Sequence, residues 1–195
     1  PYYISLGIIG IILSVTAFTL PERKDSLLQL VDDKEFVNGY ELKTMSTDEF
    51  AFRLMKGDNK LQVIDFRPFK EYEKQSLPQT ISYRFDNLFE KEPTKILNIR
   101  HKINVFVADD EQTEREFAII AERLGFTNVT ILSGGLKKFK DDILDFDKNL
   151  TATNKQEADT YRFRTKASTI IPVLIQENKS SGPVKKTQKR VIGGC

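Results

Sequence analysis

Residues 105–116, VFVADDEQTERE, bring together several side chains that could take part in acid–base or binding chemistry. An apolar run from Val105 to Val107 leads into seven residues, of which four are acidic, and an amphipathic helical pattern follows. In α/β proteins such a strand–loop–helix junction is a common place for anions and nucleophiles. This loop, however, contains no Gly, Cys, Ser or His. It therefore has the position of an active-site loop without the usual residue types.

The other reactive side chains are few. The sequence has one cysteine, Cys195, and one histidine, His101, so neither a disulfide within the chain nor a cysteine cluster for zinc can form. The acidic run of Asp109, Asp110 and Glu111 lacks the alternating spacing and central glycine of a calcium loop. The sequence therefore predicts no metal site and no cofactor.

Strand-like and helix-like segments alternate through the middle of the chain. Short apolar runs at 61–66, 103–107 and 128–132 are typical of strands buried on both faces. A helix is expected from a cap at Ser46 or Thr47 to Gly57, and another over 112–124 that ends at Gly125. Alternation of this kind predicts an α/β fold with a parallel sheet and helices on both faces.

Two segments within this region resemble a known family. Residues 63–82, VIDFRPFKEYEKQSLPQTIS, and residues 124–139, LGFTNVTILSGGLKKF, resemble two motifs of rhodanese-like domains in the family's order. The matching positions of the first motif are Val63, Ile64, Asp65, Arg67, Glu71, Tyr72, Pro78 and Ile81. The resemblance implies a three-layer α/β/α domain with a central parallel sheet over residues 44–147, about half of the chain.

The resemblance breaks at the loop between these motifs. It implies a loop of the type C-x-x-G-x-R, whose cysteine carries a sulfane sulfur as a persulfide. Counting back from Gly125 places Ala108 at the cysteine, or Asp109 with one residue of slack, and Ser76 replaces a histidine of the first motif. The degenerate loop consists of Ala108, Asp109, Asp110, Glu111, Gln112, Thr113, Glu114 and Arg115.

Carboxylates in this loop should occupy the helix N-terminus, cap its free amides and repel an anion such as thiosulfate. The residue types therefore predict that the loop has no sulfurtransferase activity and no catalytic residue. Two interpretations of the acidic residues remain open. They form either a solvated turn without a role or an acidic patch that docks a basic partner.

The N-terminal segment has the character of a membrane span. Residues 1–20 contain no charged side chain and, as a helix, would be about 30 Å long, which matches the bilayer core. A cleaved signal peptide is the alternative, but the basic region that precedes such peptides is absent. We expect one transmembrane helix at 1–21 and a juxtamembrane connector at 22–43. Arg23 and Lys24 favour a cytoplasmic domain over a periplasmic one.

Residues 148–195 are expected to form a C-terminal extension and basic tail. An apolar cluster around Pro172 is either a helix packed on the same domain or a strip that binds a partner subunit. Cys195 is either a plain chain end, a point of attachment to a partner, or a sulfur-carrying arm. The interaction candidates are Ile170, Ile171, Leu174, Lys185, Lys186, Lys189, Arg190 and Cys195.

These observations predict a membrane-anchored, catalytically inactive rhodanese-like protein that acts as an accessory or scaffolding subunit of a larger membrane complex. Its expected partners are the membrane and other protein subunits. The net charge of +2 gives no reason to expect nucleic acid. The alternative is a membrane-linked sulfur-transfer protein that carries a persulfide on Cys195. A sensor of small anions is disfavoured because the acidic loop has the wrong sign of charge.

Overall fold

A computed structural model describes residues 23–90 and 95–180, and the chain divides into two compact units between Glu41 and Leu42. The first unit contains helix α2 (Arg23–Asp32) and helix α3 (Lys34–Gly39), which begins with a side-chain cap from Asp33. No helix within the described ranges combines the length and apolarity that a bilayer crossing requires. The predicted transmembrane helix at 1–21 lies outside the described residues, so it remains a prediction.

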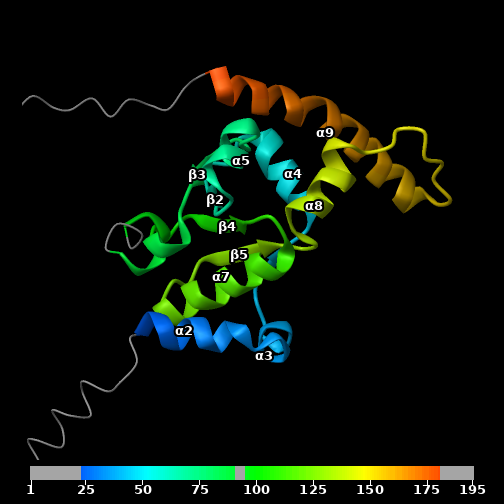
Figure 1. The fold of residues 1–195 in the computed structure, drawn as a ribbon. Helices are drawn as coiled ribbons and strands as arrows, with labels where there is room; N and C mark the ends of the chain where they lie inside the picture. Colours follow the sequence, from blue (N-terminus) through cyan, green and yellow to red (C-terminus); the bar gives the residue numbers. More distant parts are fainter. Residues whose placement is uncertain (1–22, 91–94, 181–195) are drawn as a thin grey trace, which may run out of the picture. The chain divides into compact units, whose positions relative to one another are not determined.

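The second unit is built on a five-stranded parallel sheet with the strand order β1-β5-β4-β2-β3 (Figure 1). Its strands are β1 (Thr44–Met45), β2 (Leu61–Asp65), β3 (Thr80–Ser82), β4 (Ile103–Val107) and β5 (Val129–Leu132). The long central strands pair in register, with Val63 opposite Val105, and both are fully buried. The apolar runs in the sequence correspond to these buried strands, which confirms the predicted central parallel sheet.

Helices cover both faces of the sheet. The helical elements are α4 (Thr47–Lys56), α5 (Phe69–Lys74), η1 (Phe85–Phe89), α7 (Glu111–Leu124), α8 (Gly135–Phe139), η2 (Lys140–Leu144) and α9 (Lys155–Ser180). Helix α7 lies on one face, and α4, α8 and α9 lie on the other (Figure 1). Side chains along β4 alternate accordingly. Val105 and Val107 join the core under α4 and α8, whereas the ring of Phe106 packs near α7 through Phe66 and Phe117.

Helix α9 is part of the same hydrophobic core. Ala167, Ile171 and Ile175 are spaced four residues apart, lie on one face of the helix, and are buried in the core that also contains Leu54 and Phe139. Of the two alternatives for this segment, the structure has the helix packed on its own domain. Ile171 is 0 % exposed, so the role in partner binding suggested for it is wrong in this structure. Ile170 and Leu174 beside it are only half-buried.

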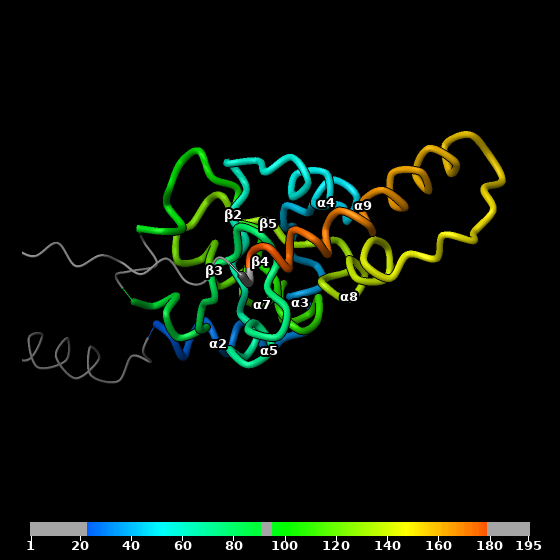
Figure 2. Tube along the Cα trace, turned by 90° about the horizontal axis from the view of Figure 1, so that it is seen from above, coloured from blue at the N-terminus to red at the C-terminus, as the bar shows by residue number. Residues whose placement is uncertain are grey.

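One arginine ties α9 to the rest of the unit. Arg164 donates two hydrogen bonds to the carboxylate of Asp48 on α4, at 2.8 and 3.0 Å, and one to Asp142 on η2 at 2.8 Å. Thr47 donates to the other oxygen of Asp142 at 2.7 Å. The connection that precedes α9, residues 147–154, projects from this unit and is mostly exposed (Figure 2). The Arg164 contacts therefore hold the first half of α9 against α4 and η2.

Candidate functional site

The loops that follow β2, β4 and β5 meet at the carboxyl edge of the parallel sheet, where α/β proteins usually bind ligands. The amide of Phe66, just after β2, donates to the carbonyl of Val107 at the end of β4 (2.9 Å). Residues 108–110, here called the post-β4 loop, connect β4 to α7. They contain two of the four acidic residues singled out in the sequence, Asp109 and Asp110, and the other two lie in the first turn of α7.

The post-β4 loop ends in a helix cap. Asp110 has extended backbone geometry, and its carboxylate accepts hydrogen bonds from the amide and the hydroxyl of Thr113, each at 2.9 Å. Glu111 lies in the first helical turn, where negative charge is favoured by the helix dipole. Asp109 and Asp110 are exposed. Part of the acidic character of this segment is thus explained by the start of a helix.

Glu114 differs from these acidic neighbours because it points into the protein. Its side chain is 0 % exposed, and Oε1 accepts hydrogen bonds from the amides of Ala108 and Leu136, both at 3.2 Å. Its other oxygen, Oε2, is buried and has no hydrogen-bond partner among the described residues. Burial raises the pKa of the Glu114 carboxyl to about 8, against the opposing effect of backbone groups of Ala108, Leu136 and Leu132. Glu114 is therefore mostly a neutral carboxylic acid at pH 7.

A pair of glycines allows this arrangement. Gly134 and Gly135 have φ of +82° and +66°, in the left-handed region that favours glycine. A Cβ on Gly135 would lie 3.0 Å from the amide nitrogen of Glu111. The turn before α8 and the first turn of α7 thus approach closely, which places the amide of Leu136 within reach of Glu114.

A second buried cluster lies at the end of β2. Asp65 and Arg67 form an ion pair at 2.7 Å, with their side chains 1 % and 5 % exposed. The guanidinium of Arg67 also donates to the carbonyl of Gln75 at 2.8 Å, and the backbone amide of Arg67 donates to Asp65 at 3.0 Å. These contacts tie the end of β2 to the segment after α5. They support a structural role for the pair, because the guanidinium is already hydrogen-bonded to Asp65 and Gln75.

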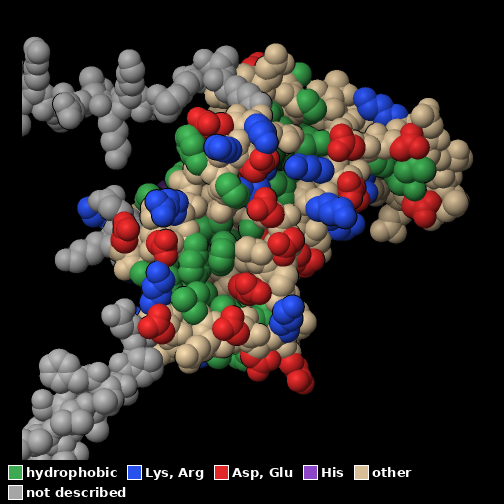
Figure 3. All heavy atoms as spheres, in the orientation of Figure 1, with side chains coloured by type: hydrophobic (Ala, Val, Ile, Leu, Met, Phe, Trp, Pro, Cys, Tyr) green, Lys and Arg blue, Asp and Glu red, His purple; other side chains and the backbone are tan. Residues whose placement is uncertain are grey.

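Next to this cluster lies a groove of about 650 Å³, here called the aromatic groove. Its lining residues are Phe66, Arg67, Pro68, Phe69, Ser82, Tyr83, Arg84, Phe85, Asp86 and Asn87. Phe69 is 61 % exposed, and Phe85 stacks on Phe117 of α7 with ring centroids 4.5 Å apart. Figure 3 shows hydrophobic side chains gathered in the middle of the face seen in Figure 1, with charged side chains around them.

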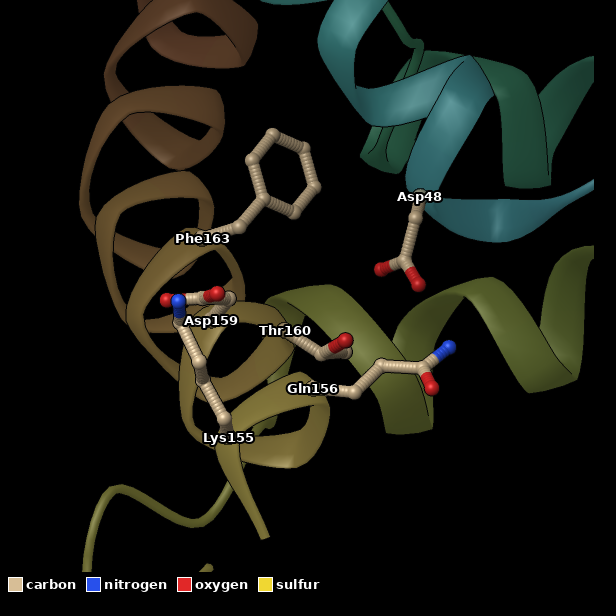
Figure 4. A pocket seen from close by; sticks show the side chains of 6 residues that line it. All are labelled: Asp48, Lys155, Gln156, Asp159, Thr160 and Phe163. Carbon is tan, nitrogen blue, oxygen red and sulfur yellow. The ribbon is translucent and has the colours of Figure 1, made fainter.

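A second hollow, of about 570 Å³, lies between α4 and the first turns of α9. Figure 4 shows Lys155, Gln156, Asp159, Thr160 and Phe163 on α9, with Asp48 across from them on α4. Asp48 is already engaged by Arg164. Within the described parts of the chain, no group of three or more His, Cys, Asp or Glu side chains could hold a metal ion.

A family model for the rhodanese-like domain matches residues 47–142. This segment is a rhodanese-like domain. Both motifs noted in the sequence, at 63–82 and 124–139, fall within the matched range. The match stops before α9, although α9 completes the core of the same compact unit.

Several solved structures are similar to the chain, and no curated protein matches it. One is a Rhodopseudomonas palustris protein described as of unknown function and a possible tyrosine phosphatase (18% identity, 59% of this chain and 89% of that chain, TM-score 0.47). Another is a single-domain sulfurtransferase from Saccharomyces cerevisiae (19% identity, 52% and 90%, TM-score 0.42). A third is a rhodanese-like domain protein from Staphylococcus aureus (18% identity, 58% and 100%, TM-score 0.43).

Within the rhodanese-like domain, residues 108–115 separate into three groups by their burial. Ala108 and Glu114 are buried together, whereas Asp109 and Asp110 face solvent. Gln112, Thr113 and Arg115 are half-buried on the first turns of α7. The composition of the loop suggested that Glu114 could belong to an exposed acidic patch. Its burial excludes this. The expected helix cap is made by Asp110.

The remaining predicted site residues lie elsewhere. Lys185, Lys186, Lys189, Arg190 and Cys195 fall outside the described residues, so their suggested roles stay predictions. Sequence reasoning missed the inward orientation of Glu114, its link to Leu136 and the aromatic groove. The first was detectable from spacing, because Glu114 shares a helical face with the buried Ala118 and Ala121.

Proposed function

We propose that this protein is a catalytically inactive rhodanese-like protein that binds other proteins as an accessory or scaffolding subunit of a membrane complex. The observation that carries the proposal is the buried Glu114 carboxyl, which accepts the amide of Ala108 at the position where the family resemblance implies a cysteine. A buried side chain in that place takes up a donor that an anionic substrate would need.

Three properties of the loop support the absence of sulfur transfer. Residues 108–115 contain no thiol, so the loop has no sulfur nucleophile. The amides of Ala108 and Leu136 are already hydrogen-bonded to Glu114. The exposed carboxylates of Asp109 and Asp110 add a negative field that disfavours binding of thiosulfate.

The binding role rests on the surface beside this loop. The aromatic groove presents Phe69 with more than half of its surface exposed, and partner interfaces are enriched in buried aromatic anchors. The apolar segment 1–21 would hold the domain at a membrane, and the basic tail from Lys185 to Arg190 would add contacts to acidic partners or lipids. This combination suits a tethered subunit better than a free enzyme.

A thiosulfate:cyanide assay on the full chain tests the first part of the proposal. We expect no turnover above the uncatalysed rate, for the natural sequence and for Cys195→Ser alike. Turnover that disappears in Cys195→Ser would instead support the alternative function, a persulfide carrier that uses the sequence's single cysteine. Turnover that persists in Cys195→Ser would contradict the argument made from the loop.

A pair of gain-of-function variants tests why the loop is inactive. Ala108→Cys introduces a thiol but leaves Glu114 hydrogen-bonded to the amides of residues 108 and 136. The double variant Ala108→Cys with Glu114→Ser also removes the carboxyl group. If occupation of the amides matters, only the double variant should acquire measurable persulfide labelling by thiosulfate. Equal labelling of the two variants would show that the missing thiol is the whole cause.

Two exposed phenylalanines allow a matched test of protein binding. Phe69 lies in the aromatic groove and is 61 % exposed, whereas Phe52 is 51 % exposed on α4, outside the groove. Native purification of the full chain from membranes should yield specific co-purifying chains. Phe69→Ala should weaken their retention at least several-fold and Phe52→Ala should not. Equal retention by both variants would exclude the groove as the binding surface.

A further inference from the structure

The Glu114 carboxyl connects two loops that come from different parts of the chain. It accepts one hydrogen bond from the amide of Ala108, at the start of the post-β4 loop, and another from the amide of Leu136 in α8. Both amides reach the same oxygen at 3.2 Å. A single carboxyl oxygen thus joins the end of β4 to the beginning of α8.

The neutral and the ionised form of this carboxyl differ greatly in the free energy that their burial costs. A neutral acid can keep both amide hydrogen bonds at Oε1 and leaves only the Oε2 hydroxyl without a partner. An ionised carboxylate would place a full negative charge where Oε2 has no donor among the described residues and no access to water. Burial of an unpaired charge costs much more than burial of an unpaired hydroxyl.

The charged groups on the surrounding elements do not offset that cost. Glu111, one turn earlier on α7, has the largest effect of any charge and disfavours ionisation of Glu114. The post-β4 loop contributes the exposed acids Asp109 and Asp110, and α8 contributes Lys137 and Lys138, which are exposed. The amino end of α7 favours negative charge in its first turn, which includes Glu114, but burial raises the pKa of this carboxyl by more than such an effect lowers it.

We propose that Glu114 is a pH-sensitive device: its neutral carboxyl holds the post-β4 loop against α8, and loss of its proton to solvent detaches the loop from α8. On detachment the carboxylate turns toward water, and the amides of Ala108 and Leu136 lose their acceptor. The opened loop lies at the edge of the sheet beside the aromatic groove, because Phe66 of that groove is hydrogen-bonded to Val107. A mildly alkaline environment would therefore reshape this surface. The inference does not depend on whether the protein transfers sulfur.

Nuclear magnetic resonance on the full chain, labelled with ¹⁵N and with ¹³C in the glutamate carboxyl groups, tests this directly between pH 6 and 9.5. The Glu114 carboxyl carbon and the amide signals of Ala108 and Leu136 should titrate together, with a midpoint near the pKa of about 8. Hydrogen-exchange protection of the two amides should fall at least tenfold across that midpoint, after correction for the intrinsic pH dependence of exchange.

Two variants provide the comparison. Glu114→Gln keeps an oxygen acceptor for both amides but cannot ionise, so its two amides should keep their protection at pH 9. Asp109→Asn removes an exposed charge from the same loop and should leave the titration in place. The proposal is overturned if the Glu114 carboxyl titrates near its ordinary value, or if the amides change with pH to the same extent in Glu114→Gln. If Glu114→Gln does not fold, the carboxyl titration in the natural sequence decides alone.

Discussion

Replacement of Ile171 by alanine tests whether α9 is an integral part of the rhodanese-like unit. Ile171 is 0 % exposed in the core cluster shared by α4, α8 and the central strands. Truncation of a fully buried Ile to Ala usually costs about 2–5 kcal/mol, since transfer and cavity effects add. We expect a loss of about 3 kcal/mol, which for a unit of this size corresponds to a fall in Tm of roughly 6–12 °C.

The same helix offers a matched control. Val173 is 53 % exposed and lies two residues from Ile171. Val173→Ala therefore removes apolar atoms from the exposed face of α9, in the same part of the helix. Its expected effect is within about 0.5 kcal/mol, as for most surface substitutions. Both free energies can be measured by urea unfolding followed by far-UV circular dichroism on residues 42–180, which belong to a single compact unit.

The comparison of the two variants shows whether α9 is docked on the core through its apolar face. If Ile171→Ala and Val173→Ala destabilise the unit equally, α9 is not docked through the face that contains Ala167, Ile171 and Ile175. A shortened segment that ends at residue 147 gives an independent check, because it exposes the apolar surface beneath α9. This segment should be less soluble and less stable than 42–180, although it contains the whole matched family range.

Three other substitutions should change stability in defined ways. Arg67→Met leaves the Asp65 carboxylate buried without its partner and should cost about 3–5 kcal/mol in urea unfolding. Gly135→Ala places a Cβ 3.0 Å from the backbone nitrogen of Glu111, at a positive φ. It should lower the free energy of unfolding more than Gly57→Ala, where a Cβ meets open space at a similar φ. The difference between the urea midpoints of the two variants measures the effect of the close approach. For Glu114 the folded pKa of about 8 exceeds the ordinary value of 4.5, so its favourable contribution to stability is complete below pH 4.5 and is lost as the pH rises toward 8. The loss should reach at most ~5 kcal/mol and be absent in Glu114→Gln; parallel stability–pH curves for the two proteins would contradict the assignment.

Much of the sheet and of the helix boundaries was predictable, because the signals are local. The apolar runs at 61–66 and 103–107 became the central strands β2 and β4. Ser46 caps α4, and Gly57 and Gly125 end α4 and α7 in left-handed geometry, as the cap and glycine patterns indicated. Period, capping and turn chemistry depend on residues within a few positions of one another, so they can be read from a linear sequence.

The candidate site was predictable only in part. The acidic composition of residues 109–114 and the absence of a cysteine there were evident. A carboxylate cap on the following helix was also predicted, and the structure assigns it to Asp110. From the sequence, Glu114 was grouped with the solvent-facing acids of the loop. In the fold it is buried and accepts a hydrogen bond from the amide of Leu136, 22 residues further along the chain. Composition reports which charges are present, but the pKa of each charge depends on burial, which adjacent segments do not determine.

The amino-acid sequence by itself determined the parallel α/β core, its two rhodanese-like motifs and the absence of a thiol from residues 108–115, because each depends on short-range pattern or on residue identity. Only the tertiary structure decided that α9 completes the core and that Glu114 joins two loops. Both depend on contacts between distant segments, such as the pairing of Arg164 with Asp48 across 116 positions. Burial and hydrogen bonding of this kind arise when the chain packs, and the free energy that they contribute belongs to the assembled unit.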